Sequence, residues 1–369
     1  MIKKIAFTGV VVALLVLLMP AGMTAGSSPA VTSSSVDVNF PASLTFHVTT
    51  SSDANITDVR LHYIVDRMSH AQIVSEIRVP VAPAKNVTAE WLWDMRMSGG
   101  MPPGSSIDYW WTITDAGGGT LETAPARVFI DDDRYDWQHI TRGSVTLFWY
   151  EGNDAFAGDL MNAVDAALSR LAANTGAALA DPVRLYIYAS SADLQGSMIF
   201  PQEWTGGVAF TEYGVVTIGI PPDAAGLDWG TGAIAHELTH LVVHQVTFNP
   251  YNSLPTWLDE GLAMTAEGEL ESQFTDVLSD AIGNDALISV RSLASPFSAY
   301  ADQSVLAYAQ SREIVKYLID TYGQLKMFEL LNTFAQGAGY DEALLKVYGF
   351  DMDGLNAKWL ASYMAEAAK

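Results

Sequence analysis

Residues 236–240 read His-Glu-Leu-Thr-His, and residues 257–261 read Trp-Leu-Asp-Glu-Gly. Residues four apart are neighbours on one face of a helix, so His236 and His240 can direct imidazole nitrogens at one metal ion. Glu237 lies beside them, where a carboxylate can take a proton from water whose pKa zinc lowers to about 7. The pattern predicts one zinc ion with His236 and His240 as ligands and Glu237 as the general base.

A third ligand is expected on the following helix. Nineteen residues separate His240 from Glu260, enough to end one helix, turn through residues 249–255 and begin a second helix that returns to the metal. Residues 232–235 and 241–243 are largely apolar, which is typical of a buried helix and not of a solvated surface helix. We therefore expect Glu260 to be the third zinc ligand.

His244 continues the four-residue spacing but is not expected to bind the same ion. Eight residues of helix rise by about 12 Å, too far for His236 and His244 to reach one zinc ion. His244 is instead predicted to pack in the core or to support a ligand.

With residues 205–210 (Thr-Gly-Gly-Val-Ala-Phe) and 254–263 around the second motif, this part of the chain resembles the gluzincin branch of the zincin metallopeptidases. Within that branch it looks like the peptidase MA-like domain, which is similar to the core of M1 aminopeptidases and thermolysin-type enzymes. The resemblance spans roughly residues 140–365 in outline. It implies a zincin-like α+β domain that hydrolyses peptide bonds in a peptide or protein substrate.

The resemblance also assigns roles outside the motif. Glu267 lies seven residues after Glu260, the offset at which M1-like relatives carry an acidic residue that supports a ligand histidine; a solvated surface glutamate would fit equally well. Zincin relatives have an edge strand upstream of the metal helix that pairs with an extended peptide, although an ordinary sheet edge would read the same way. The corresponding residues here are Gly207, Val208 and Ala209.

Tyr308 is the candidate donor for the oxyanion that develops during hydrolysis, a task that zinc usually shares with a Tyr or His. It resembles a late tyrosine of this peptidase class, and it lies in a predicted helix downstream of Glu260. An aromatic packed in the core is the alternative interpretation.

The N-terminal third predicts a different domain. Short β-rich runs at 36–40, 44–50, 59–65, 73–79, 88–94, 107–114 and 126–130 indicate an all-β, immunoglobulin-like or fibronectin-like sandwich. Beyond it, we expect a strand at 144–150, a helix at 155–174, a strand at 183–189 and a strand or hairpin at 207–220, followed mostly by helices. We therefore expect a signal peptide at 1–25, a Ser-rich linker at 26–35, the sandwich at 36–132 and the metallopeptidase domain at 133–369. The acidic run 131–133 at the junction fits a solvated linker better than a calcium site.

The net charge and the cysteine content exclude some partners and some kinds of stabilisation. The 369 residues contain 42 acidic and 19 basic side chains, for a formal charge of −23, and no cysteine. A chain with this much negative charge should repel nucleic acid and acidic membrane surfaces. Membrane attachment is therefore expected only if the signal segment is an uncleaved anchor. Without cysteine, disulfide bonds are excluded.

The sequence as a whole predicts a secreted or extracytoplasmic zinc metallopeptidase. A zinc hydrolase that acts on something other than a peptide is one alternative. A non-catalytic extracellular or cell-surface binding module that retains a zincin fold is another. The intact Glu237 argues against the binding module, because such a module has no need of a base beside its metal ligands.

Overall fold

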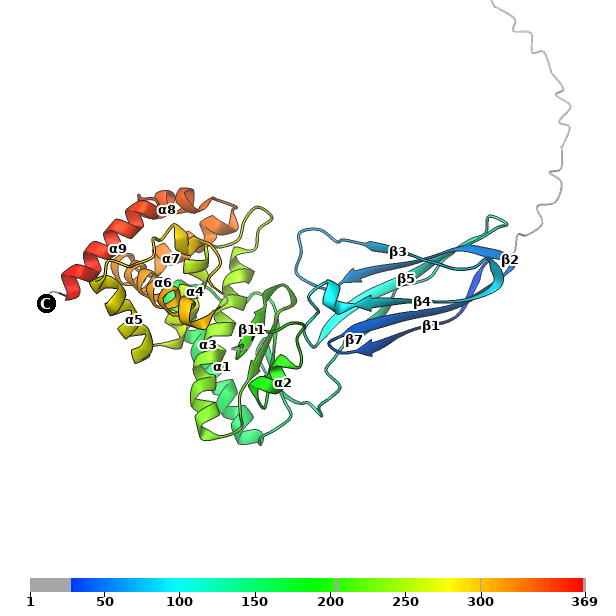
Figure 1. Ribbon diagram of the computed structural model, residues 1–369, viewed down its shortest axis with the longest axis horizontal. Helices are drawn as coiled ribbons and strands as arrows, with labels where there is room; N and C mark the ends of the chain where they lie inside the picture. Colours follow the sequence, from blue (N-terminus) through cyan, green and yellow to red (C-terminus); the bar gives the residue numbers. More distant parts are fainter. Residues whose placement is uncertain (1–27, 203–204, 299, 368–369) are drawn as a thin grey trace, which may run out of the picture.

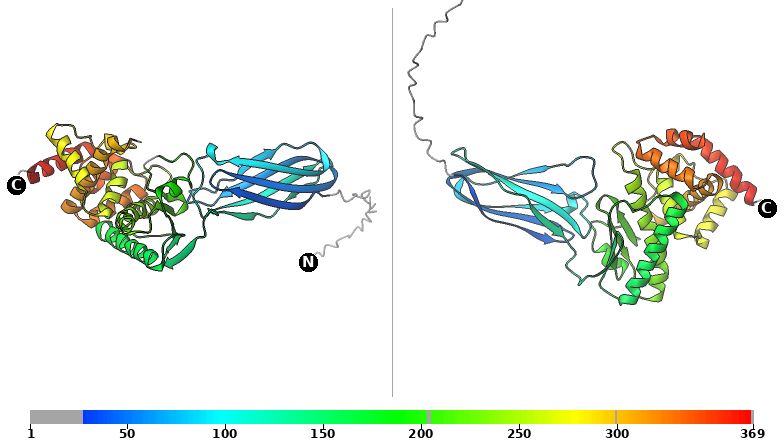
Figure 2. Two further views of the ribbon diagram at one scale, coloured as in Figure 1. Left: turned by 60° about the horizontal axis from the view of Figure 1, so that its bottom comes forward. Right: turned by 180° about the vertical axis from the view of Figure 1, so that it is seen from behind.

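The computed structural model describes residues 28–202, 205–298 and 300–367 of the chain. An all-β body built from β1–β7 lies end to end with an α+β body built from the remaining strands and the helices (Figures 1 and 2). This arrangement confirms the predicted fold class. The predicted signal peptide lies outside the described residues. Within the described ranges, no helix is both long and apolar enough to cross a membrane.

The long strand β2 organises the all-β body. Its first part pairs with β1 and β4, and its last part pairs with β3 and β5, with irregular pairing between Ser51 and Asp58 where it passes from one layer to the other. Phe46, Leu61 and Trp111 are buried between the layers. The strands are β1 (Ala30–Asn39), β2 (Ser43–Val65), β3 (Ser75–Val79), β4 (Ala84–Asp94), β5 (Ser105–Asp115), β6 (Thr120–Glu122) and β7 (Ala126–Ile130).

The expected Ser-rich linker, residues 26–35, is wrong from Ala30 onward, because β1 begins there and pairs with β2. Ser34 shows why serines do not prevent this strand: its hydroxyl accepts a hydrogen bond from Trp111 Nε1 at 3.0 Å. The preference of serine for loops is weak, and backbone pairing with a neighbouring strand outweighs it. The sequence also divided β2 into two strands and missed β6.

The α+β body contains a five-stranded sheet in the order β11-β12-β10-β9-β8. Strands β9, β10 and β12 are parallel, and the antiparallel β11 forms one edge. Helices α1 and α3 cover one face of this sheet, and an apolar core lies between the helices and the sheet. Its strands are β8 (Gln138–Arg142), β9 (Val145–Trp149), β10 (Val183–Tyr188), β11 (Gly207–Phe210) and β12 (Val215–Gly219).

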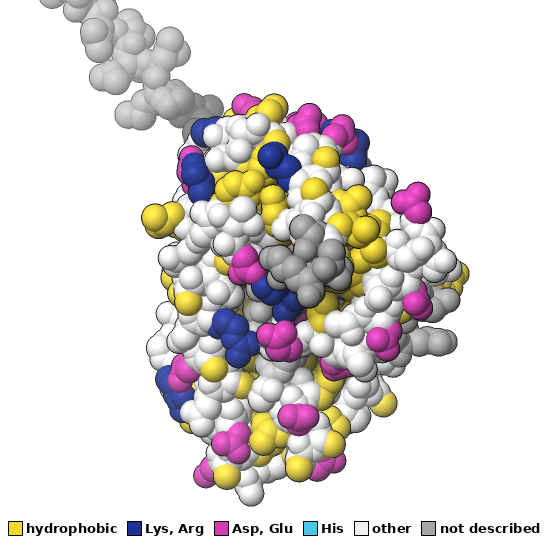
Figure 3. Space-filling model, turned by 90° about the vertical axis from the view of Figure 1, so that its left-hand side faces the viewer, with side chains coloured by type: hydrophobic (Ala, Val, Ile, Leu, Met, Phe, Trp, Pro, Cys, Tyr) yellow, Lys and Arg dark blue, Asp and Glu magenta, His cyan; other side chains and the backbone are white. Residues whose placement is uncertain are grey.

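The remaining helices pack beyond α3 in a second apolar core (Figure 1). Gly261 allows α4 and α6 to approach closely, because a Cβ at this position would lie 2.5 Å from the carbonyl oxygen of Ser311. The helices are α1 (Asp154–Thr175), α2 (Ser191–Gln195), α3 (Ala224–Thr247), α4 (Thr256–Glu267), α5 (Ser272–Gly283), α6 (Ala301–Tyr322), α7 (Gln324–Ala335), α8 (Tyr340–Tyr348) and α9 (Met352–Ala367). Acidic side chains are spread over the face that carries the C-terminal helices (Figure 3).

The sandwich contacts the short helix η2 (Thr211–Tyr213), which directly follows β11. Arg67 forms an ion pair with Glu212 at 2.7 Å, and the amide of Met68 donates to the carbonyl oxygen of Glu212 at 2.7 Å. The all-β body therefore holds the turn that ends the edge strand.

The acidic run at the junction is not a solvated linker throughout. Asp132 is buried, receives two hydrogen bonds from the Arg134 guanidinium at 2.7 and 2.5 Å, and receives another from the Tyr188 hydroxyl at 2.8 Å. A buried carboxylate is stable when its oxygens are paired in this way. Asp132 thus fixes the connection between the two bodies.

Candidate metal centre and substrate cleft

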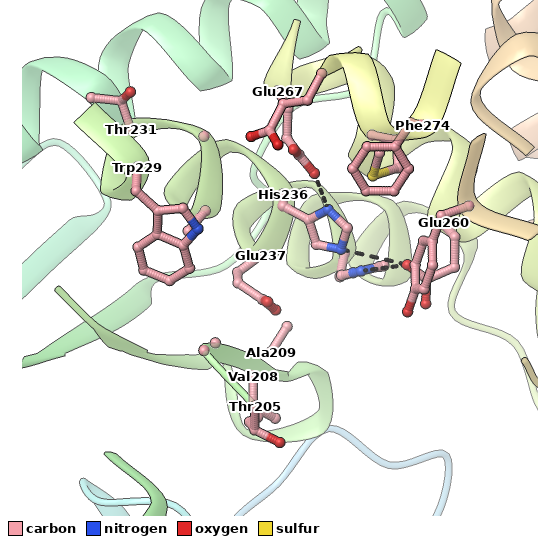
Figure 4. Close-up of a pocket in the computed structure, with 18 of the residues that line it drawn as sticks. Thr205, Val208, Ala209, Trp229, Thr231, His236, Glu237, Glu260, Glu267 and Phe274 are labelled. Carbon is pink, nitrogen blue, oxygen red and sulfur yellow. Dashed lines mark hydrogen bonds and ion pairs between the residues drawn. The ribbon is translucent and has the colours of Figure 1, made fainter. Parts of the chain in front are cut away.

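Helices α3 and α4 bring the three predicted ligands together. The side chain of Asp223 caps the start of α3, accepting a hydrogen bond from the amide of Gly226 at 2.8 Å. After α3 ends, the chain turns back and α4 begins behind Pro255, which places Glu260 close to both His236 and His240. Figure 4 shows Glu260 facing His236. The sequence argument for a returning helix is consistent with this geometry.

The spacing of the ligand atoms fits a zinc ion. Oε2 of Glu260 lies 3.5 Å from Nε2 of His236 and 3.6 Å from Nε2 of His240. Ligands about 2.0–2.2 Å from a tetrahedral zinc ion are about 3.3–3.6 Å apart. The same distances are too long for good hydrogen bonds. The three side chains are therefore arranged around a point and not bonded to one another.

The Glu260 carboxylate gives an independent test of the fit. Its Oε2 atom is buried and has no hydrogen-bond partner among the described residues. A buried, unpaired carboxylate oxygen is costly unless a cation compensates for its charge. A zinc ion between the three ligand atoms would supply that cation, so the donor set fits the expected metal.

Both imidazole rings are oriented by carboxylates on α4. Nδ1 of His236 lies 2.5 Å from Oε1 of Glu267, and Nδ1 of His240 lies 2.9 Å from Oδ1 of Asp259. These contacts leave each Nε2 free to face Glu260, which is the common arrangement of metal-binding histidines. Of the two interpretations of Glu267, support of a ligand histidine fits the geometry.

His244 lies one turn beyond His240 and contacts Asp259 from the other side. Its Nε2 is 2.8 Å from Oδ2 of Asp259, and the ligand atoms of His240, His244 and Asp259 all lie within 4.8 Å of one another. Direct hydrogen bonds already occupy the facing atoms of this group. We therefore interpret His244 as a residue that fixes Asp259; that it is not a zinc ligand stays a prediction.

Glu237 faces the edge strand. A Cβ added to Gly207 would lie 2.8 Å from Oε1 of Glu237, so the carboxylate packs directly against the backbone of β11 at this glycine. Among the described side chains, Glu237 has no hydrogen-bond or ion-pair partner. Its carboxylate is thus available to a molecule in the cleft.

A cavity of about 1210 Å³ contains all the predicted site residues. Gly207, Val208 and Ala209 line it from the free edge of β11, and Tyr308 lines it from α6, with its ring packed edge-on against Phe297 at 5.2 Å between centroids. The cavity is therefore lined by the three candidate zinc ligands, the candidate base, the edge strand and the candidate oxyanion donor. Whether each residue performs its predicted role stays a prediction.

The carboxylates and the imidazoles shift one another's pKa. Burial lowers the pKa of His236, but Glu260 and Glu267 outweigh burial and raise it to about 9. Burial raises the pKa of Glu260, but the two histidines outweigh burial and lower it to about 2. The surroundings therefore favour positive charge at the imidazoles, and a bound zinc ion would provide it while both rings are neutral.

Glu237 and Tyr308 are shifted toward their neutral forms. Burial raises the pKa of the Glu237 carboxyl, with partial opposition from His236 and His240. Burial, together with the charge of Glu260, also raises the pKa of Tyr308 well above its usual range. The Tyr308 hydroxyl is therefore a protonated donor at neutral pH.

The sequence-based prediction missed one residue that orients a histidine and two that hold the C-terminal end of α4. Asp259 orients His240, and only the helical proximity of His240 and His244 hinted at a shared acidic partner. Arg170 donates to the carbonyl oxygens of Ala266 and Glu267, and Arg312 donates to that of Gly268 at 3.0 Å. Arginines that bind the last carbonyl oxygens of a helix stabilise its C-terminal end. No local sequence pattern identifies such distant partners.

Comparison with known proteins matches the C-terminal body. A family model described as the Peptidase MA superfamily matches residues 163–365, which is more than half of the chain. This match confirms the resemblance predicted from the sequence. A search of curated proteins finds no match.

Solved structures match at low identity. An M1 zinc metallopeptidase from Deinococcus radiodurans is 13% identical, with 88% of this chain and 91% of that chain covered and a TM-score of 0.39. OgpA from Akkermansia muciniphila is 8% identical over 29% of each chain, with a TM-score of 0.22. A β-1,3-glucan-binding domain of carbohydrate-binding module family 56 is 20% identical over 26% of this chain and 95% of that one, with a TM-score of 0.17. These scores are too low to bear on function.

Proposed function

The chain belongs to the Peptidase MA superfamily, and we propose that it is a zinc-dependent metallopeptidase that hydrolyses peptide bonds. The observation that carries the proposal is the arrangement of His236, His240 and Glu260 around the buried, unpartnered oxygen of Glu260. Secretion is part of the proposal because residues 1–25 have the pattern of a signal peptide.

Each residue in the cleft has a chemical task in this proposal. When bound by the three ligands, zinc would supply a Lewis acid that polarises the scissile carbonyl and makes water more acidic. The Glu237 carboxylate would take a proton from the attacking water and pass it to the leaving nitrogen. The Tyr308 hydroxyl would donate a hydrogen bond to the carbonyl oxygen as negative charge develops there.

The edge strand gives the cleft a means of holding a peptide. Strand β11 pairs with β12 on one side only, and its other edge lines the cavity beside Glu237. An extended peptide can add to such an edge through backbone hydrogen bonds. This geometry supports a peptide substrate over a small non-peptide one.

Peptide-library cleavage tests the function. We expect zinc-loaded protein to cleave unstructured peptides, and we expect a chelator to abolish cleavage and added zinc to restore it; mass spectrometry would identify the products. Stoichiometric zinc binding with no cleavage of any library member would instead support the non-catalytic binding module.

Tyr308→Phe tests the oxyanion donor. Loss of one such donor typically costs about 10²–10³-fold in kcat, so we expect kcat to fall by that factor while KM and zinc content stay close to wild type. Tyr317→Phe is the matched control, because it removes a hydroxyl from the same helix outside the cavity. Equal kcat in Tyr308→Phe and Tyr317→Phe would show that Tyr308 is only a packing aromatic.

A further inference from the structure

Carboxylates outnumber basic side chains among the ionisable residues that line the cleft. Seven carboxylate residues and three histidines line the cavity, and no lysine or arginine is among the described lining residues. Four of the carboxylates belong to the metal centre, and a bound zinc ion would offset only two of their charges. The cleft thus remains negative when the metal is present.

Three further carboxylates lie outside the metal centre. Asp228 is on α3, and Glu269 and Glu271 are in the short segment between the end of α4 and the start of α5. Asp228 has no ion pair among the residues that the structure describes. The Arg312 guanidinium is 3.8 Å from Glu269, and it is already paired with Glu313. Basic neighbours therefore offset little of this charge.

Aromatic side chains line the cleft together with these carboxylates. Trp229 directly follows Asp228, and 47% of its surface is exposed although it lines the cavity. Its ring covers the backbone of Gly206, where an added Cβ would lie 3.0 Å from the indole. In Figure 4, Trp229 and Phe274 lie on opposite sides of His236. Exposed aromatic rings beside carboxylates attract organic cations through the ring quadrupole as well as through charge.

We propose that the cleft selects peptides with a lysine or arginine side chain near the scissile bond, bound by Asp228 and Trp229 on α3 and by Glu269 and Glu271 between α4 and α5. This inference deepens the peptidase function proposed above and rests on it. The aliphatic stem of lysine or arginine would pack on the Trp229 ring while the charged end reaches a carboxylate. The formal charge of −23 on the chain would also attract cationic peptides from a distance.

The first experiment compares peptides that differ in one side chain. Lysine, glutamine or glutamate is placed in turn at each position around one cleaved bond, and kcat/KM is measured at low and high salt. We expect the lysine peptide to exceed the glutamate peptide by about 10-fold or more at one or more positions, and the ratio to fall as salt screens the charges. Equal kcat/KM for the three peptides at every position would overturn the inference.

The second experiment tests whether Asp228, Glu269 and Glu271, which we call the rim of the cleft, cause the preference for lysine. The triple variant Asp228→Asn, Glu269→Gln, Glu271→Gln should lose most of the lysine preference while it retains zinc and cleaves the glutamine peptide. The matched control Asp53→Asn, Glu122→Gln, Asp159→Asn changes the same number of exposed carboxylates outside the cavity. An equal loss in both variants would show that net charge, and not the rim, sets the preference.

A peptide-binding measurement distinguishes failure of the charge preference from failure of the proposed peptidase function. If no peptide is cleaved, the peptidase function fails, but the charge preference can still be measured as the Kd of labelled lysine and glutamate peptides for zinc-loaded protein. Tighter binding of the lysine peptide that weakens in the rim variant would support the charge preference of the cleft. Equal binding would overturn it.

Discussion

Glu237→Gln is expected to lower kcat for peptide hydrolysis by about 10³-fold while the protein keeps its zinc. General acid–base groups typically contribute about 10²–10⁴-fold, and an amide cannot accept the proton that a carboxylate takes from water. Glutamine has nearly the same shape, and the missing Cβ of Gly207 leaves the same space beside it. The measurement is kcat on a library-derived peptide together with zinc content by metal analysis.

The control for this variant is Glu151→Gln, which makes the same chemical change at an exposed position outside the cavity. It should leave kcat, KM and zinc content at wild-type values. If Glu237→Gln retained most of the wild-type kcat at saturating zinc, another group would have to be the base. If it lost zinc as well as activity, Glu237 would be part of metal binding and its assignment as the base would fail.

The arrangement of the candidate zinc ligands was largely predictable because helical spacing sets the positions of these residues. His236 and His240 must share a face whenever residues 236–240 are helical, and the turn before Pro255 leaves Glu260 few other places to point. Asp259 was missed because its role depends on a side-chain direction that follows from the crossing of α3 and α4. Such a crossing results from packing of the whole domain and not from local sequence.

The fold was predictable to a similar extent and for similar reasons. Alternating apolar residues indicated most strands of the sandwich, and the parallel strands β9 and β10 read as short apolar runs. Strand β1 was truncated because four of its residues are serine or threonine in a run without apolar alternation, residues 32–35. Only pairing with β2 makes this segment a strand. Long-range pairing of that kind is not visible in a local pattern.

Glu260→Gln is expected to weaken zinc binding by more than about 100-fold, beyond the 10–100-fold typical of residues that only support a ligand. Glutamine keeps the volume of the side chain but removes the negative charge whose oxygen is buried and unpartnered beside His236 and His240. Zinc should therefore raise the melting temperature of metal-free wild-type protein and have little effect on Glu260→Gln. Calorimetric titration with zinc gives the affinities directly.

Glu267→Gln and Asp259→Asn are the graded controls. Each removes a carboxylate that contacts Nδ1 of a histidine, while both Nε2 atoms and Glu260 remain, so each should weaken zinc binding by about 10–100-fold. If the cluster were only a structural network of histidines and carboxylates, zinc would stabilise none of the four proteins, and Glu260→Gln would change the unfolding free energy alone. Equal zinc affinity in the wild type and Glu260→Gln would remove Glu260 from the ligand set and, with it, the observation on which the proposed function rests.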